Sequence, residues 1–253
     1  YRLLYTILPN ISSVNATIKY VLWRLAAAFL VLALMNPKIG TTTTEAKIKG
    51  IDIMLAVDVS NSMLAEDIKP NRILRATRAI EKMLEQLHGD RIGIVVFAGQ
   101  SFVQLPITSD YSAGKLFLSS INTDMVPVQG TAIGSAIDLS MKSFDFESPA
   151  QKVIVIITDG ENHEDDAIAS AKAASAQGVK VYTIGLGSPE GTPIPHFVRG
   201  RRDGFMKDRD GNTVITKLNE DMLRDIASAG NGSYIRGSTA EVGLNPLLDD
   251  LND

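Results

Sequence analysis

Residues 51–62, IDIMLAVDVSNS, decide the fold, because an apolar run rich in β-branched residues ends in a cluster of small polar side chains. Such a run is typical of a strand that is buried on both faces of a parallel sheet. It leads directly into Asp58, Ser60 and Ser62, at the carboxyl end of the expected strand. Ligands of open α/β sheets bind at that edge. The stretch therefore predicts a central strand and the place of a functional site.

The rest of the chain continues this alternation of strands and helices. Residues 91–98, 152–158 and 180–185 are apolar runs typical of strands, and residues 71–87 carry apolar side chains at helical spacing. Further elements are expected as helices over residues 110–120, 131–144, 165–177, 219–229 and 240–251, and as short strands over 101–105 and 233–236. The pattern predicts a doubly wound α/β fold with a mostly parallel sheet and one antiparallel edge strand, residues 101–105.

Between residues 188 and 217 the regular alternation stops. Turn signals stand at residues 202–204 (RDG) and 210–212 (DGN), and the second lies between two strand-like triplets, 205–207 and 214–216. We therefore predict a projecting hairpin, inserted before the last helices. Beside it lies a small basic cluster, Arg199, Arg201 and Arg202. A solvated loop is the ordinary explanation of such a cluster, and contact with an acidic partner is the sharper one.

Composition excludes several classes of function. Of the 253 residues 45% are hydrophobic and 21% charged, with a net charge of −4, which is typical of a globular domain. The chain lacks the basic surplus of nucleic-acid-binding proteins, so no nucleic-acid partner is expected. It has no cysteine, which excludes disulfides, thiolate zinc sites and cysteine nucleophiles.

The N-terminal part, residues 1–40, is predicted to associate with a membrane. Residues 20–35, YVLWRLAAAFLVLALM, are apolar on every face, and Arg24 can extend its charge to the interface. A buried core helix and a signal peptide are the alternatives, and both fit less well. Basic residues are equally numerous on the two sides, and only the closeness of Lys19 and Arg24 places the N-terminus in the cytoplasm. Residues 41–49 are expected to be a linker.

Three loops carry oxygen donors that the fold would bring together. Asp58, Ser60 and Ser62 follow the first strand, Thr131 opens a helix, and Asp159 follows the strand over residues 152–158. Each alone could be a helix cap or a turn residue. Together they supply two carboxylates and three hydroxyls at one sheet edge, the ligands that a hard cation such as Mg²⁺ prefers.

The order and spacing of these five residues resemble the metal-ion-dependent adhesion site of von Willebrand factor A (vWA) domains. The resemblance covers residues 50–253 and leaves all five positions intact. It implies that Ser60, Ser62 and Thr131 bind the metal directly and that Asp58 and Asp159 act mainly through water. It further implies a position that takes a Glu or Asp from a protein ligand. Mg²⁺ is the expected ion, with Mn²⁺ or Ca²⁺ as alternatives.

A narrower resemblance is to the Bat (Bacteroides aerotolerance) membrane proteins, closest to the BatB type. It is carried by residues 36–40 (NPKIG), 49–53 (KGIDI), 62–72 (SMLAEDIKPNR) and 207–212 (KDRDGN). It implies membrane helices on both sides of the vWA domain, so that the chain would start after one helix and stop before another. It also implies the inner membrane with the domain in the periplasm, and a stress-tolerance or assembly complex. The expected partners are other Bat-type membrane proteins and a MoxR-type AAA+ ATPase.

Three classes of function compete. The first is a non-enzymatic, metal-dependent protein-binding module held at a membrane. The second is a metal-assisted hydrolase, for which only Glu161 and His163 are free to act as a base near the metal. The third is a structural membrane scaffold, which would give the five oxygens no role. The first hypothesis therefore leads, and no catalytic residue is expected.

Overall fold

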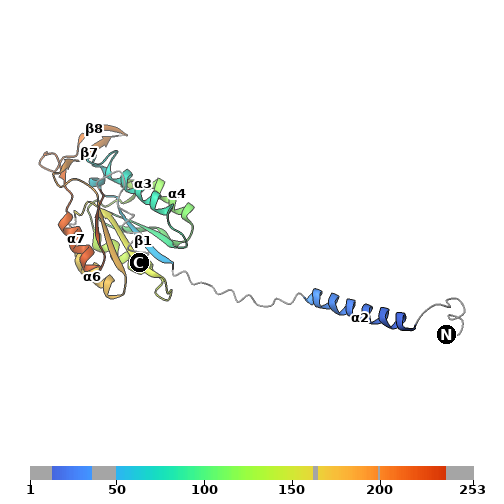
Figure 1. Ribbon diagram of the computed structural model, residues 1–253. Coiled ribbons are helices and arrows are strands. Elements are labelled where there is room, and N and C mark those ends of the chain that lie inside the picture. Colours follow the sequence, from blue (N-terminus) through green and yellow to red (C-terminus); the bar gives the residue numbers. More distant parts are fainter. Residues whose placement is uncertain (1–12, 36–49, 162–164, 199, 238–253) are drawn as a thin grey trace. The chain divides into compact units, whose positions relative to one another are not determined.

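The computed structural model describes residues 13–35, 50–161, 165–198 and 200–237 (Figure 1). The predicted linker over residues 41–49 and the predicted helix over 240–251 lie outside these ranges. The chain forms two compact units, residues 1–46 and 47–253, and each is described by itself.

In the first unit the structure describes one helix, α2 (Ser13–Met35). Its segment Thr17–Met35 is long and apolar enough to cross a membrane. The helix begins seven residues before the predicted start at residue 20, because a helix continues through polar residues that precede an apolar run. Its large apolar side chains are exposed, Trp23 and Leu34 the most. Such a surface needs an apolar environment to cover it.

The second unit is built on a six-stranded sheet in the order β10-β5-β4-β1-β2-β3. Its strands are β1 (Ile51–Asp58), β2 (Arg91–Phe97), β3 (Ser101–Thr108), β4 (Gln151–Thr158), β5 (Lys180–Gly185) and β10 (Tyr234–Arg236). All neighbouring strands pair in parallel except β2 and β3, which are antiparallel. The predicted fold class is therefore confirmed, with β3 as the antiparallel edge strand.

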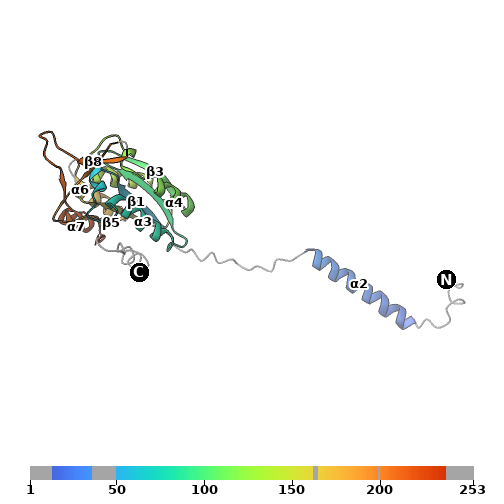
Figure 2. The same ribbon diagram turned by 90° about the horizontal axis from the view of Figure 1, so that it is seen from above.

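Helices cover both faces of this sheet, with α3 and α4 on one side and α6 and α7 on the other (Figures 1 and 2). They are α3 (Arg72–Leu84), α4 (Tyr111–Ser120), α5 (Ile133–Ser143), α6 (Ala167–Ala176) and α7 (Glu220–Ala229). Side chains of β1 alternate between two cores: Leu55 packs with the α3 side, and Met54 packs with α5 and α6. A strand that is buried on both faces is mostly apolar, and residues 53–57 predicted this placement.

Several helices begin one or two residues later than predicted, because a polar residue at the predicted start is the N-cap. The side chains of Asn71, Asp110, Asp166 and Asn219 each accept a backbone N–H of the first turn in this role. This capping satisfies donors that the helix itself leaves unpaired. Two short 3-10 helices, η1 (Asn61–Leu64) and η2 (Thr123–Met125), complete the loops at the carboxyl edge.

The insertion between β5 and α7 contains two small sheets. In one, β6 (Thr192–Pro193) pairs with β9 (Ile215–Thr216), and in the other, β7 (Pro195–Val198) pairs with β8 (Arg201–Phe205). The predicted turn at residues 202–204 is wrong, since these residues lie within β8. Gly204 has a φ of +78° and lies beside a register shift in this ladder, so the glycine serves a bulge and not a turn.

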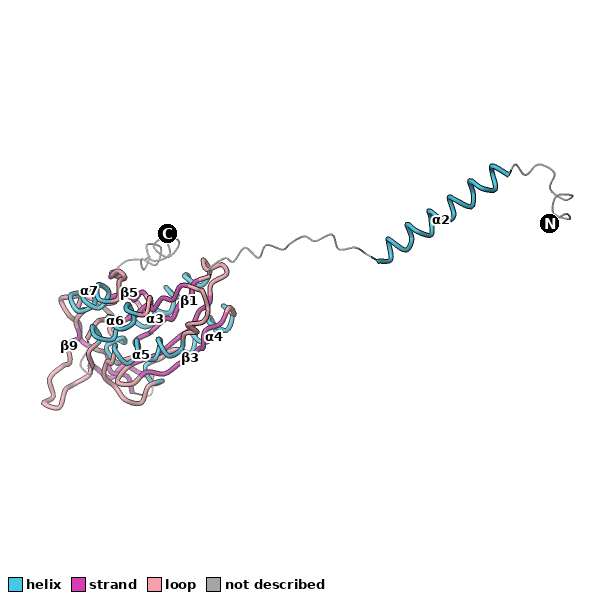
Figure 3. Tube along the Cα trace, turned by 90° about the horizontal axis from the view of Figure 1, so that it is seen from below, coloured by secondary structure: helices cyan, strands magenta, loops and turns pink. Residues whose placement is uncertain are grey.

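The predicted hairpin around residues 210–212 is present but irregular. The backbone N–H of Asp208 donates to the carbonyl oxygen of Asn212 at 2.9 Å, and Lys207 and Thr213 form an isolated bridge. Figure 3 shows a loop that projects from the domain beside β9. The insertion therefore carries two successive hairpins, of which the sequence predicted the second.

Candidate metal site

The sheet brings the two predicted aspartates to one edge. Asp58 is the last residue of β1, and Asp159 directly follows the last residue of the neighbouring parallel strand β4. The hydroxyl Oγ1 of Thr158 donates to Oδ2 of Asp58 at 2.5 Å, which ties the ends of the two strands together. Both aspartates are fully buried. Their carboxylates thus lie at the carboxyl edge, where α/β sheets bind ligands.

The two predicted serines adjoin Asp58. The backbone N–H of Ser60 donates to Oδ1 of Asp58 at 2.8 Å, which turns the chain just after the strand. The Oγ atoms of Ser60 and Ser62 are 2.9 Å apart, and both residues are buried. The hydroxyls of the first loop therefore meet at one point.

The loop that carries Thr131 is held against the first loop by a residue that the sequence did not single out. Oε1 of Gln129 accepts the backbone N–H of Asn61 at 3.0 Å, and the backbone N–H of Ala132 donates to Ala98 at 2.8 Å. Gly130 has a φ of +133°, a conformation that favours glycine. Thr131 is buried beside these contacts.

A second residue that the sequence analysis missed is Arg72, the first residue of α3. It is fully buried, and its Nη1 donates to Oδ2 of Asp159 at 2.7 Å. Its other nitrogens bind both carboxylate oxygens of Asp67, at 3.0 and 2.7 Å. One signal could have revealed it: Arg72 precedes the buried Ala76 and Ile80 at four-residue spacing, on the apolar stripe of the helix.

Burial and neighbouring charges shift the pKa values of Asp58 and Asp67 in opposite directions. Burial, followed by repulsion from Asp159, raises the pKa of Asp58 from 3.8 to about 7, although hydrogen bonds from Thr158 and Ser60 oppose the rise. Burial would also raise the pKa of Asp67, but the hydrogen bonds and the charge of Arg72 lower it below its usual value. Asp58 is thus a buried carboxyl group for whose ionised form the described residues provide no direct cationic partner.

This donor set fits a hard divalent cation. Asp159 and Asp67 share the guanidinium of Arg72, and Asp58 adds a third carboxylate close enough to be repelled by Asp159, so ionisation of all three leaves two negative charges for a divalent ion to balance. Every donor among the five site residues is an oxygen, as Mg²⁺, Mn²⁺ and Ca²⁺ prefer. Among the described residues no three His, Cys, Asp or Glu side chains form a metal-binding group. Neutral hydroxyls must therefore supply part of any coordination.

The residues considered for catalysis are occupied or lie outside the described ranges. Oε1 of Glu161 accepts the backbone N–H of Lys217 at 2.9 Å, which engages that carboxylate in the end of the insertion. His163 lies in residues 162–164, outside the described part of the chain. Of these two residues, the structure therefore describes only Glu161, and it binds Glu161 to the end of the insertion.

The basic cluster is only partly described. Arg202 pairs with Glu66, Nη1 to Oε2 at 3.3 Å, and its guanidinium lies 4.9 Å from the ring centre of Phe205. Glu66 belongs to the loop that continues from η1, so the pair links hairpin β7–β8 to the segment that follows Ser62. Arg201 is exposed, and Arg199 lies outside the described residues.

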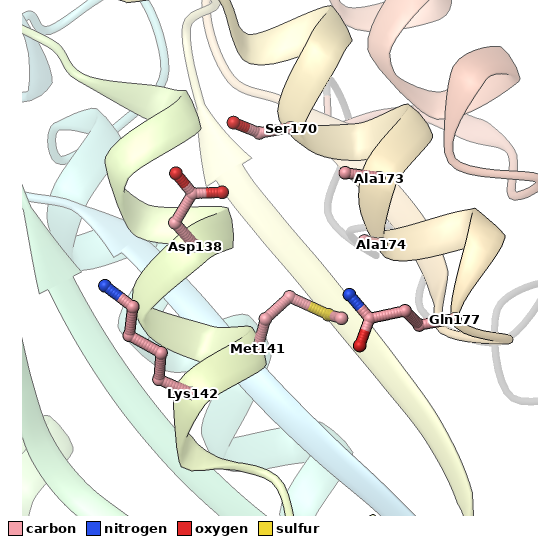
Figure 4. Close-up of a pocket in the computed structure, with 7 residues that line it drawn as sticks. All are labelled: Asp138, Met141, Lys142, Ser170, Ala173, Ala174 and Gln177. Atoms are coloured by element: carbon pink, nitrogen blue, oxygen red, sulfur yellow. The ribbon is translucent and has the colours of Figure 1, made fainter.

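A groove of about 300 Å³ lies elsewhere, between α5 and α6 (Figure 4). Asp138, Met141 and Lys142 of α5 face Ala173 and Ala174 of α6, and Gln177 at its C-cap, across the groove. It shares no residue with the five oxygens, and its helix walls offer one acid and one base. The carboxyl edge of the sheet is therefore the better candidate for a functional site.

Comparison with known proteins agrees with this fold. Residues 52–236 match the von Willebrand factor type A domain family, and the chain belongs to that family. Within it, the chain is similar to an aerotolerance-related membrane protein from Bacteroides fragilis NCTC 9343, with 46% identity and a TM-score of 0.76. It is also similar to BatB from Bacteroides thetaiotaomicron, with 43% identity and a TM-score of 0.76. Each comparison covers 80% of this chain and 99% of the solved one. The predicted resemblance to BatB-type proteins is confirmed.

A curated relative, an uncharacterized protein of Borreliella burgdorferi, is 31% identical over 169 residues. That match covers 66% of this chain and 49% of the relative. The chain thus spans about half the length of this protein, and the activity of a longer protein is a matter for proposal.

Proposed function

We propose that this chain is a membrane-anchored vWA domain that binds a protein partner through a divalent cation, with Mg²⁺ as the expected ion. Asp58, Ser60, Ser62, Thr131 and Asp159 would hold the ion. The observation that carries the proposal is the buried carboxyl group of Asp58, which has neutral hydrogen-bond partners and a pKa raised to about 7. Such a group is costly unless a cation balances it.

The donor set supports binding of an acidic ligand. Three of the five residues offer neutral hydroxyls, and Arg72 already shares the charge of Asp159. When bound, the cation would supply a Lewis-acidic centre that attracts a carboxylate from outside. The chain's own residues orient the donors, through the contacts of Thr158 and Gln129, and keep them buried. A Glu or Asp of the partner would complete the shell.

Hydrolysis is the weaker alternative. It would need a base with access to a metal-bound water. Glu161 is engaged by the backbone of Lys217, and Asp159 by Arg72. Asp58 is assigned to the ion itself, so the acids described at the edge already have other roles, which favours binding over catalysis.

The rim of the site supports a protein ligand over a small molecule. Hairpin β7–β8 exposes Phe197, Val198 and Phe205, together with Arg201 and Arg202. Aromatic residues and arginine are enriched at protein interfaces. We propose that this hairpin, together with Arg199, provides specificity for an acidic and partly apolar surface.

Helix α2 supports the proposed place in the cell, the bacterial inner membrane with the vWA domain in the periplasm. The similar protein of Bacteroides fragilis is described as a membrane protein. Other Bat-type membrane proteins are the proposed partners in a stress-tolerance or assembly complex, accompanied by a MoxR-type AAA+ ATPase. A reporter that is active only in the periplasm, fused after Asp253, should be active. Activity of a cytoplasmic reporter in its place would reverse the topology.

The binding proposal can be tested by capture of partners from membranes of the source cells with the detergent-solubilised chain. Specific partners should be retained in Mg²⁺, released by EDTA and bound again after Mg²⁺ is restored. Thr131→Ala should weaken capture. Thr77→Ala, which removes a buried hydroxyl from α3 that donates to Leu74, should leave capture unchanged. Retention of every specific partner in EDTA would refute the proposal. Metal-dependent turnover of a phosphate or peptide substrate would favour the alternative function, a metal-assisted hydrolase.

A further inference from the structure

A buried arginine joins the metal site to both ends of the insertion. Arg72 contacts Asp159 of the site, and its Nη1 also lies 2.9 Å from Oγ1 of Thr216 in strand β9. We infer that Arg72 is a positioning residue that presents the cation site and the insertion as one binding surface, so that an ion at Asp159 also stabilises the insertion. The inference rests on the proposed function and adds a coupling between its two halves.

The guanidinium is held in one orientation. Nε and Nη2 of Arg72 donate to the two carboxylate oxygens of Asp67, a bidentate pair that fixes the plane of the group. Nη1 is then left to face Asp159 and Thr216. Lysine has neither the plane nor the fork, so it could not make these contacts together.

The start of the insertion is bound to the same ion pair. Oδ2 of Asp67 accepts the backbone N–H of Ser188 at 2.8 Å, just after β5. A Cβ atom on Gly187 would lie 2.8 Å from Cζ of Arg72, so the backbone passes directly against the guanidinium. The carbonyl oxygen of Ser188 in turn accepts the N–H of Leu218, which closes the base of the insertion.

The end of the insertion is bound to the metal site itself. Oγ1 of Thr216 donates to Oδ2 of Asp159 at 3.2 Å, and Thr216 is fully buried in β9. The carbonyl oxygen of Asp159 accepts the backbone N–H of Asn219 at 2.8 Å. A cation that fixes the carboxylate of Asp159 therefore also fixes the acceptor on which β9 depends. Coupling of this kind is reciprocal, so a partner that holds the insertion should strengthen cation binding.

Substitutions at Thr216 can distinguish the coupling between the cation site and the insertion from Mg²⁺ binding itself. Thr216→Val keeps the volume and removes the hydroxyl, whereas Thr216→Ser keeps the hydroxyl. Thr183→Val is the matched control, because Thr183 is equally buried and donates to the carbonyl oxygen of Leu223, away from Asp159. Mg²⁺ affinity is measured by calorimetry, and amide hydrogen exchange of residues 192–216 is measured with and without Mg²⁺, on the full chain in detergent.

In the wild type, Thr216→Ser and Thr183→Val, saturating Mg²⁺ should slow exchange in the insertion by roughly tenfold. Thr216→Val should bind Mg²⁺ within about threefold of the wild type, yet its insertion should no longer respond. A full response in Thr216→Val would overturn the inference, as would Mg²⁺ binding without any response in the wild type. Failure of the wild type to bind Mg²⁺ would refute the proposed function and the inference together.

Discussion

The two ends of strand β1 carry buried aspartates with opposite surroundings. Asp52, at the beginning, is 1% exposed, and its two carboxylate oxygens each accept a 2.7 Å hydrogen bond from Arg91. Asp58, at the end, is also buried, but the partners that the structure describes for it are the hydroxyl of Thr158 and the backbone of Ser60. One strand thus holds a compensated carboxylate and an uncompensated one.

The difference teaches how to distinguish a structural acid from a functional one. A buried carboxylate with a bidentate arginine is satisfied within the fold, and removal of one partner mainly costs stability. A buried carboxyl group with neutral partners beside a second acid resists ionisation, as the pKa of about 7 at Asp58 expresses. Its ionised form becomes favourable once a cation arrives. The acid at the amino edge of the sheet is therefore satisfied within the fold, and the acid at the carboxyl edge is the one that we propose receives an ion.

The largest expected effect is loss of cation binding when the carboxyl edge is changed. Asp58→Ala with Ser60→Ala should lower Mg²⁺ affinity by at least roughly 100-fold, because a carboxylate and a hydroxyl are removed from one site. The matched control is Asp52→Ala with Ser148→Ala, which removes an aspartate and a serine that bind Arg91 at the other edge. Titration calorimetry of the folded chains decides: equal heats from the wild type and the Asp58 variant would refute the site.

A second, smaller effect concerns stability without metal, and its sign should differ between the two ends. Because the folded-state pKa of Asp58 lies above its unfolded value of 3.8, the favourable contribution of its protonated form is lost as pH rises from about 4 to 7. Asp58→Asn should thus raise the free energy of unfolding at pH 8 in EDTA, by at most about 4 kcal/mol. The gain should fall by more than half at pH 5.

Asp52→Asn should instead lower that free energy, by about 2 kcal/mol, since Arg91 loses its charge partner but is partly exposed to water. Urea unfolding of both variants at the two pH values measures these changes. Mg²⁺ should reverse the order at the carboxyl edge by stabilising the wild type above Asp58→Asn. A loss of stability from Asp58→Asn in EDTA at pH 8 would mean that Asp58 is as well compensated as Asp52.

The sequence predicted the fold because its central strands have a composition that can be recognised without a structure. A strand buried on both faces is mostly apolar, and residues 53–57 and 153–157 show this directly. The topology then places the residues that follow β1 and β4 at one edge, so Asp58 and Asp159 could be assigned together before any coordinates. These oxygen donors follow the ends of their strands directly in the sequence, and a pattern of neighbouring residues can be recognised in a sequence.

Contacts between segments that are distant in the sequence could not be predicted. Arg72 binds Asp159 across 87 positions and Thr216 across 144, and nothing near Arg72 in the sequence names either partner. Its place on the apolar stripe of α3 indicated burial, but not what would balance its charge. The prediction of a turn in the insertion was wrong for another reason. The sequence predicts a turn at Gly204, whereas the positive φ of this glycine serves a bulge in β8, and the two uses of glycine look alike in a sequence.

The smallest expected effect lies at the rim of the carboxyl edge, where charges face water. Arg201→Gln with Arg202→Gln should slow association with an acidic partner by roughly three- to tenfold and reduce its dependence on salt, because exposed charges act mainly on encounter. Stability should hardly change, since Arg202 and Glu66 form a partly exposed pair.

Arg224→Gln on α7 is the control, since that arginine is comparably exposed and lies outside the insertion. Association and dissociation rates measured from low to physiological salt should show the change in association alone, and only for the rim variant. An equal effect of Arg224→Gln would reduce the role of the hairpin to net charge.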